Sequence, residues 1–176
     1  MKDFRTLFDT CVFAFDGKNS ILEDKDIGIC ADMAVPEVEG ATGYLDTNFD
    51  GKVEAAKKAF ADGSDLVYLH FEAPDECGHR GEAENKVKAI EIIDSKVVGV
   101  MKDYLEALGD YRILIMPDHP TPLNTKTHSS KPVPYLIYDS REALGGVATF
   151  TEATAESTGL YVEHGPDIMK KLIGEL

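Results

Sequence analysis

The residues best suited to chemistry are histidines that lie close to aspartates in three separate segments. Asp75 and His79 are four positions apart, Asp118 and His119 are adjacent, and His128 follows in the next segment. A four-residue spacing lets two side chains reach one ion, and Gly78 allows the backbone to bend there. Carboxylates and imidazoles together form a mixed oxygen and nitrogen ligand set, which suits manganese or zinc better than calcium. These segments therefore predict a divalent metal site.

Each of these segments, taken alone, is also typical of an ordinary surface turn. The metal interpretation depends on the three of them meeting, and on their holding three of the five histidines in the chain. Of the other two, His70 is expected to be a hydrogen-bonded core residue within a strand, and His164 an ordinary surface residue. Arg80 is a candidate phosphate contact because it follows His79, although an arginine at such a position is more often simply solvated.

Three nearly continuous apolar runs, at residues 65–71, 111–116 and 132–138, predict buried strands. Runs without alternation are typical of a sheet that is covered on both faces, as parallel sheets are. In open parallel sheets, ligands bind beyond the carboxyl ends of the strands. Because the aspartate and histidine segments flank these runs, we expect their side chains to gather at one rim of the sheet.

Helical patterns alternate with the predicted strands. Residues 51–61 form a short amphipathic pattern, and Pro166 is placed to open a final helix that runs through Leu172. Residues 21–33 fit a helix by the capping-box spacing of Ser20 and Glu23, although part of the segment alternates as a strand would. A long helix is expected over 82–108, with one core-facing stripe formed by Val87, Ile90, Ile93, Val97, Met101 and Leu105. The alternation predicts an α/β fold, a three-layer sandwich with a mainly parallel sheet, in a single domain over 1–176.

The charge balance limits the classes of partner. The chain of 176 residues carries 32 acidic against 18 basic side chains, a formal net charge of -14. It has no basic stripe that could displace phosphate counterions, which argues against binding to nucleic acid or to an anionic membrane. A phosphorylated substrate would require bound divalent cations to reverse the local charge. Three widely spaced cysteines and no apolar run of membrane-spanning length predict a cytoplasmic protein.

The ordered motifs resemble a known family. They are Glu-Ala-Pro-Asp75-Glu-Cys-Gly-His79, then Pro-Asp118-His119-Pro-Thr-Pro, then Thr-His128-Ser-Ser-Lys-Pro-Val-Pro. In this order they resemble the metal signature of archaeal-type cofactor-independent (2,3-bisphosphoglycerate-independent) phosphoglycerate mutases, within the alkaline phosphatase superfamily. The segments at 40–47 and 86–94 are also similar to that family. The resemblance extends from about residue 27 to the C-terminus, and the register of residues 1–26 is uncertain.

The resemblance implies an activity and a set of metal ligands. Asp75, His79 and His128 would hold one ion, while Asp118 and His119 would be part of a second site. The family interconverts 2- and 3-phosphoglycerate in glycolysis by phosphoryl transfer through a phosphoserine, with two divalent ions. Manganese is the expected metal and zinc the alternative. At most one of the two sites is expected to be complete in this chain.

The resemblance covers only the C-terminal portion of the family. The nucleophilic serine and a further aspartate ligand belong to an N-terminal half that cannot be located here, so the chain alone is predicted to be inactive. The strand-like run at 11–15 ends in Asp16, which is a possible additional metal ligand. A partial sheet would expose an edge, which predicts a homo-oligomer. The alternatives are another phosphoryl-transfer enzyme of the superfamily (phosphopentomutase, phosphatase or kinase-like) and a truncated, non-catalytic metal-binding domain.

Overall fold

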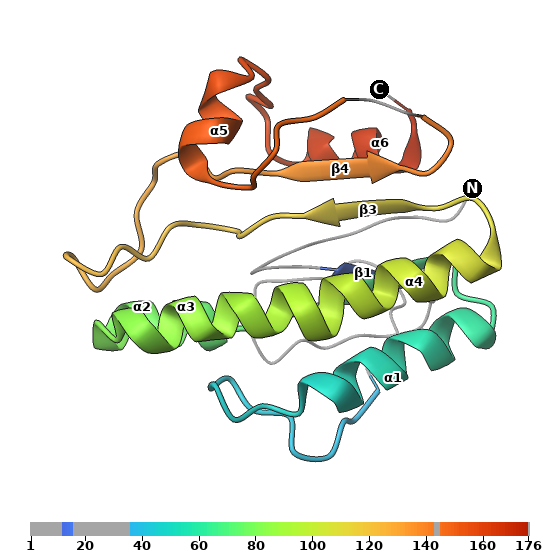
Figure 1. Cartoon of the computed structure of the whole chain (residues 1–176), viewed down its shortest axis with the longest axis horizontal. Helices are drawn as coiled ribbons and strands as arrows, with labels where there is room; N and C mark the ends of the chain where they lie inside the picture. The colour runs from blue at the N-terminus through green and yellow to red at the C-terminus, as the bar shows by residue number, and fades with distance from the viewer. Residues whose placement is uncertain (1–11, 16–35, 143–144, 176) are drawn as a thin grey trace.

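The computed structural model describes residues 12–15, 36–142 and 145–175, which form four short strands, six α-helices and one π-helical segment. Figure 1 shows the strands between a long helical rod on one side and the C-terminal helices on the other. In chain order the elements are β1 (Val12–Phe15), α1 (Phe49–Ala61), β2 (Leu66–Leu69), α2 (Ala73–Arg80), α3 (Ala83–Ile92), η1 (Ile93–Val98), α4 (Gly99–Leu108), β3 (Arg112–Ile115), β4 (Leu136–Asp139), α5 (Glu152–Ser157) and α6 (Asp167–Ile173).

The strands of the described residues form two antiparallel pairs. β1 pairs with β2, with Val12 opposite Leu69, and β3 pairs with β4, with Arg112 opposite Asp139. The chain is therefore a mixed helix and strand structure, as predicted, but these pairings differ from the mainly parallel sheet that the apolar runs predicted. A parallel neighbour requires a crossover, usually a helix. The segment at 116–135 between β3 and β4 contains no helix, so the chain turns back and the two strands run antiparallel.

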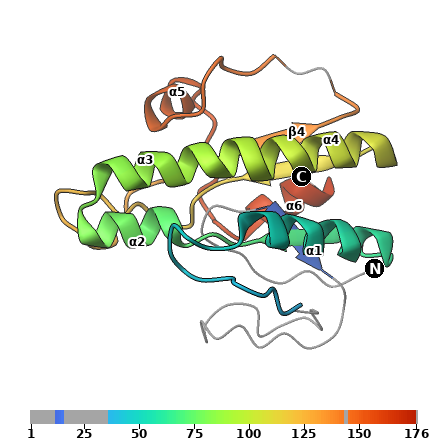
Figure 2. The same ribbon diagram turned by 60° about the horizontal axis from the view of Figure 1, so that its bottom comes forward.

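The helix predicted over 82–108 is confirmed as one continuous rod made of α3, η1 and α4. Figure 2 shows α1 and α2 one after the other along its side. Its predicted core stripe is correct at four positions and wrong at two, because Val87 is 56% exposed and Ile90 is 50% exposed. The face of α3 that is buried is instead the one that carries Ala89. The positions of the stripe that are buried are Ile93, Val97, Met101 and Leu105.

Two apolar clusters fill the interior. In the larger one, α1 and the rod pack against β2, and Phe49 of α1 stacks on Phe71 with ring centroids 5.3 Å apart. In the smaller one, α6 packs against β3. The larger cluster contains Phe49, Val53, Ala56, Val67, Leu69, Phe71, Ala73, Ala89, Ile93, Val97, Met101, Leu105 and Ile113, and the smaller contains Leu114, Ile168, Met169 and Leu172.

The remaining elements test the other expectations. The three predicted strands and the helices at 51–61 and 166–172 are confirmed, with shorter strands than their apolar runs. The prediction that all three strands are buried is wrong for β4, in which two of the four residues are exposed. The expected helix at 21–33 lies outside the described residues. Two short helices, α2 and α5, were not predicted. α5 buries none of its side chains and begins with a capping box between Thr151 and Thr154, so it lacks the apolar stripe by which a helix is recognised.

Several large apolar side chains remain exposed near β4 and α5. Leu136 and Tyr138 of β4 are more than one third exposed, as are Phe150 and Leu160 on either side of α5. Oligomerisation through this edge stays a prediction. No helix in the described part of the chain is long and apolar enough to cross a membrane.

Candidate metal centre

The helix α2 presents two of the predicted ligands on one face. Pro74 occupies an early helical position where its missing N–H costs nothing, and Gly81 ends the helix with a left-handed φ of 72°. Within this short helix, Asp75 and His79 are separated by about one turn. His79 Nε2 lies 3.1 Å from Asp75 Oδ2, so the two side chains point toward the same place.

The segment after β3 brings the other ligands. The backbone N–H of His119 donates to Asp118 Oδ1 at 2.6 Å, and His119 Nε2 lies 3.1 Å from Asp118 Oδ2. The segment then turns back on itself, because the N–H of Ser129 donates to the carbonyl of Pro120 at 2.9 Å. This return places His128 beside His119, with the two rings stacked at a centroid distance of 3.7 Å.

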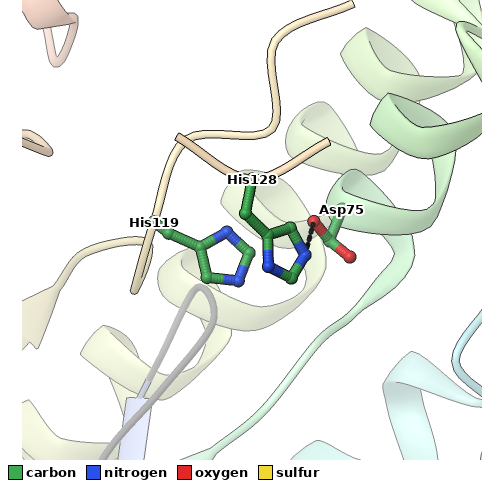
Figure 3. A group of neighbouring side chains, drawn as sticks. All are labelled: Asp75, His119 and His128. Carbon is green, nitrogen blue, oxygen red and sulfur yellow. Dashed lines mark ion pairs between the residues drawn. The ribbon is translucent and has the colours of Figure 1, made fainter. Parts of the chain in front are cut away.

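The two segments converge on one point. Asp75, His119 and His128 each offer a ligand atom, and these atoms all lie within 4.8 Å of one another. Figure 3 shows the three side chains together, with His128 between the other two and 3.6 Å from Asp75 Oδ1. His79 joins them, since its Nε2 lies 2.9 Å from His128 Nε2. All five residues that the sequence predicted as ligands therefore lie in one cluster.

The ring orientation of His79 is fixed by the backbone. His79 Nδ1 lies 3.0 Å from the carbonyl oxygen of Lys126, and a carbonyl oxygen can only accept a hydrogen bond. The hydrogen is therefore on Nδ1, and the lone pair of Nε2 faces Asp75 and His128. Lys126 presents its carbonyl from a left-handed backbone, with φ of 54°, which is uncommon for a residue other than glycine.

The donor set fits a divalent cation. A carboxylate oxygen and imidazole nitrogens with lone pairs facing one another repel, and a cation between them relieves that repulsion. Among the described residues, the ion pairs of Asp75 are with histidines alone. The ligand atoms are nitrogen and oxygen, the combination that manganese and zinc accept. The cluster could therefore hold such an ion.

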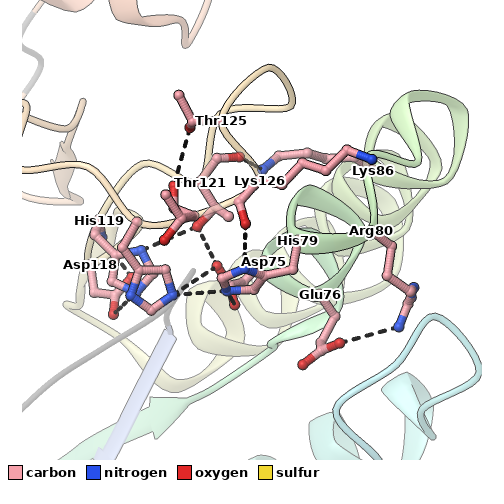
Figure 4. Close-up of polar contacts among 12 residues, drawn as sticks. Asp75, Glu76, His79, Arg80, Lys86, Asp118, His119, Thr121, Thr125 and Lys126 are labelled. Atoms are coloured by element: carbon pink, nitrogen blue, oxygen red, sulfur yellow. Dashed lines mark hydrogen bonds and ion pairs between the residues drawn. The ribbon is translucent and has the colours of Figure 1, made fainter.

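Arg80, the candidate phosphate contact, faces away from the cluster. Its guanidinium donates to Glu82 at 2.8 Å and to Glu76 at 3.2 Å, and it lies over the ring of Tyr44. Figure 4 shows Arg80 turned toward Glu76 on the far side of α2. The hydrogen bond to Glu82 raises the pKa of Arg80. In this structure Arg80 fixes local geometry, and its contact with a phosphate stays a prediction.

The other candidates lie elsewhere. Asp16 lies outside the described residues. His70 was predicted to be a core residue within a strand, but β2 ends at Leu69 and His70 is only partly buried, with its ring stacked on Tyr68. His164 is exposed beside Asp167, as expected of a surface residue. Sequence reasoning missed the backbone carbonyl of Lys126 and the side chain of Thr121, which contacts Asp75. Neither carries a sequence signal, because each acts through a contact made only in the folded chain.

Three comparisons with known proteins bear on this cluster. A sequence profile of the metalloenzyme superfamily matches residues 23–173. A probable 2,3-bisphosphoglycerate-independent phosphoglycerate mutase from Geobacter sulfurreducens is 50% identical over 150 residues, which is 85% of this chain and 37% of that protein. The 2,3-bisphosphoglycerate-independent phosphoglycerate mutase from Methanothrix thermoacetophila is 47% identical over 85% of this chain and 38% of its own length. The chain thus spans somewhat more than a third of the length of these relatives.

A solved structure has the same fold. The PH0037 protein from Pyrococcus horikoshii superimposes with a TM-score of 0.71 and 33% sequence identity, over 80% of this chain and 42% of that protein. The superposition therefore covers most of this chain, while more than half of the solved protein has no counterpart in it.

Proposed function

Because this chain belongs to the metalloenzyme superfamily, we propose that its cluster of histidines and aspartates binds divalent metal for a phosphoglycerate mutase that interconverts 2- and 3-phosphoglycerate. The observation that carries the proposal is the convergence of Asp75, His79 and His128 from two separate segments. The relatives named as phosphoglycerate mutases support the choice of reaction. The proposal concerns the whole enzyme, of which this chain corresponds to somewhat more than a third.

The ligands divide into two groups in this proposal. Asp75, His79 and His128 hold the first ion, and Asp118 and His119 contribute to a second. The stacking of His119 on His128 puts the two groups in direct contact, as two ions acting on one phosphoryl group require. We propose manganese as the metal, with zinc as the alternative, on the basis of the mixed ligand set.

The ligands prepare the site for an anionic substrate. A divalent ion, when bound, supplies Lewis-acid stabilisation of phosphoryl oxygens and positive charge in an acidic protein. His79 contributes through the tautomer that Lys126 sets, since the Nε2 lone pair is held toward the site. Asp118 holds His119 in place through the backbone N–H of that histidine. These contacts fix the ligand atoms before a substrate arrives, so little reorganisation remains at the moment of reaction.

The transferred group passes through a phosphoserine in the proposed reaction, and we assign no nucleophilic serine within this chain. We therefore expect the chain alone to bind metal without turnover. We also propose a three-layer, mainly parallel sheet for the full-length enzyme, supported by the helical crossover of α2, α3, η1 and α4 between β2 and β3. A cytoplasmic location is consistent with Cys77, a buried free thiol.

The test measures metal binding and turnover in the same preparation. Manganese is titrated into the protein, and conversion of 3-phosphoglycerate to 2-phosphoglycerate is followed together with phosphate release. Tight binding without turnover by this chain, and turnover on mixing with the part of the Geobacter protein that it does not match, is the expected result. Phosphate release without 2-phosphoglycerate would favour the phosphatase alternative. Protein that binds no manganese would overturn the proposal.

A further inference from the structure

Thr121 lies between the two groups of proposed ligands and belongs to neither. Its side chain is buried, with the residue only 4% exposed. The hydroxyl oxygen is hydrogen-bonded to Asp75 Oδ1 and lies 3.3 Å from His119 Nδ1 (Figure 4). One hydroxyl therefore contacts a ligand proposed for the first ion and a ligand proposed for the second.

The chemistry of these groups fixes the direction of the hydrogen bond from Thr121 to Asp75 and allows one from His119 to Thr121. A carboxylate can only accept, so the single hydroxyl hydrogen of Thr121 points to Asp75. The hydroxyl oxygen is then left as an acceptor, and His119 Nδ1 satisfies it by donating its hydrogen. That tautomer keeps the lone pair of His119 on Nε2, the atom 3.1 Å from Asp118 Oδ2. The other tautomer, in which Nε2–H donates to Asp118 Oδ2, would leave Nδ1 as the metal-binding atom, and the second experiment below distinguishes the two.

The backbone of Thr121 is held from two helices. Its carbonyl accepts a hydrogen bond from Lys86 Nζ of α3 at 2.9 Å. On α2, Gly78 leaves room for this approach, because a Cβ there would lie 2.7 Å from the Thr121 carbonyl oxygen and 2.8 Å from its Cγ2. The backbone that carries the hydroxyl is thus bonded to α3 and packed closely against α2.

We propose that Thr121 is a positioning residue that joins the two metal sites through one hydrogen-bond chain, from His119 through its hydroxyl to Asp75. The inference rests on the proposed function, since it assumes that these residues bind metal. Hydrogen-bonding partners behind metal ligands typically change metal affinity tenfold to a hundredfold when they are removed. The Thr121 hydroxyl is expected to have an effect of that size on both ions.

The first experiment compares manganese affinity, by electron paramagnetic resonance, in the wild type and three variants. Thr121→Val keeps the shape and removes the hydroxyl, and it is expected to weaken binding about tenfold to a hundredfold. Thr121→Ser restores the hydroxyl and is expected to return the affinity to within about threefold of the wild type, well below the loss of about tenfold to a hundredfold expected when the partner is removed. The matched control is Thr125→Val, because Thr125 lies on the same segment but bonds only to backbone carbonyls. Melting temperatures of the metal-free proteins establish that each variant folds.

The second experiment identifies the metal-binding nitrogen directly. Nitrogen-15 NMR of the zinc-loaded wild type is expected to show His119 bound to zinc through Nε2, with the hydrogen on Nδ1. Binding through Nδ1 would overturn the inference, as would wild-type affinity in Thr121→Val. In either case the metal site itself, and with it the proposed function, would stand. Wild-type protein that binds neither metal would overturn both.

Discussion

Two carboxylates of this chain, Asp75 on α2 and Asp139 at the end of β4, have similar burial and very different partners. Their side chains are 18% and 9% exposed, respectively. Asp139 accepts hydrogen bonds from two guanidinium groups, those of Arg141 and Arg112. Asp75 is surrounded by the imidazoles of His79 and His128 and by a threonine hydroxyl, which bring no permanent charge.

The consequence differs for each carboxylate. Hydrogen bonds from Arg141, and then from Arg112, hold the pKa of Asp139 well below its usual range. Arg112 also donates to the carbonyl of Leu172 at the end of α6, so Asp139 helps to fix that helix to the β3–β4 pair. The charge of Asp139 is compensated within the chain, whereas for Asp75 we propose an external cation as the compensating charge. One carboxylate stabilises the fold, and the other is a proposed metal ligand.

The sharpest test of this contrast replaces each carboxylate by its amide. Asp75→Asn is expected to weaken manganese binding by more than about a hundredfold. Removing a metal ligand costs more affinity than removing a hydrogen-bonding partner of a ligand. Asp139→Asn is expected to leave manganese affinity unchanged and to lower the melting temperature. Calorimetric titration and thermal unfolding of both variants measure the two effects. Equal loss of manganese affinity in the two variants would contradict the distinction between a metal-binding Asp75 and a structural Asp139.

Two histidines extend the comparison to the imidazoles. His128→Ala removes a ligand that touches both His79 and Asp75, and we expect manganese affinity to fall by about a hundredfold. His164→Ala is the matched control, since His164 is exposed. Among the described residues, its side chain forms an ion pair with Asp167 and none with the cluster. Its manganese affinity should equal that of the wild type. A comparable loss in His164→Ala would mean that histidine content, rather than this cluster, governs binding.

A pair of helical glycines tests how closely α2 must approach Thr121. Gly78→Ala places a methyl group against the Thr121 backbone, and overpacking of this kind costs about 1–3 kcal/mol. We expect manganese affinity to fall about tenfold as well, since Thr121 contacts Asp75. In Gly99→Ala the new Cβ would meet its nearest atom at 3.5 Å, an ordinary contact, so that variant should gain about 0.5–1 kcal/mol of stability. Urea unfolding and metal titration separate the two outcomes.

The smallest expected effect is a pH dependence. Because the folded-state pKa of Asp139 lies below its unfolded value, its contribution to stability is fully present above about pH 5 and is lost as the pH falls through the folded pKa. The difference in melting temperature between wild type and Asp139→Asn should therefore be constant above about pH 5 and narrow below about pH 4. A difference that widens on acidification would contradict the assigned partners.

The ligand cluster could be predicted from the sequence because the ligand types are rare and their order in the chain is distinctive. The rim argument that brought them together assumed a parallel sheet, yet the described strands pair antiparallel. The predicted ligands meet because α2 begins four residues after β2, and because the segment after β3 folds back at Pro120 and contacts α2. The helix α2 itself was missed because its eight residues are too few to show periodicity.

The parts that could not be predicted depend on contacts between distant segments. Thr121 and the carbonyl of Lys126 have no distinguishing sequence pattern, since 46 and 47 positions separate them from Asp75 and His79. Val87 and Ile90 were placed in the core because the predicted stripe assumed a regular helix. Their exposure follows from the irregular segment η1, whose position no hydrophobic pattern revealed.

That π-helical segment sets the rotational phase between the two ends of the rod. The buried positions Ala89, Ile93, Val97, Met101 and Leu105 repeat every four residues, a spacing that drifts by about 40° per repeat in a regular α-helix. The wider turn of η1 takes up much of this drift. Winding the same six residues as a regular α-helix would rotate α3 by about 100° against α4 and carry Lys86 away from Thr121. The irregular winding of the rod is thus tied to the candidate metal centre, through a segment remote from every predicted ligand.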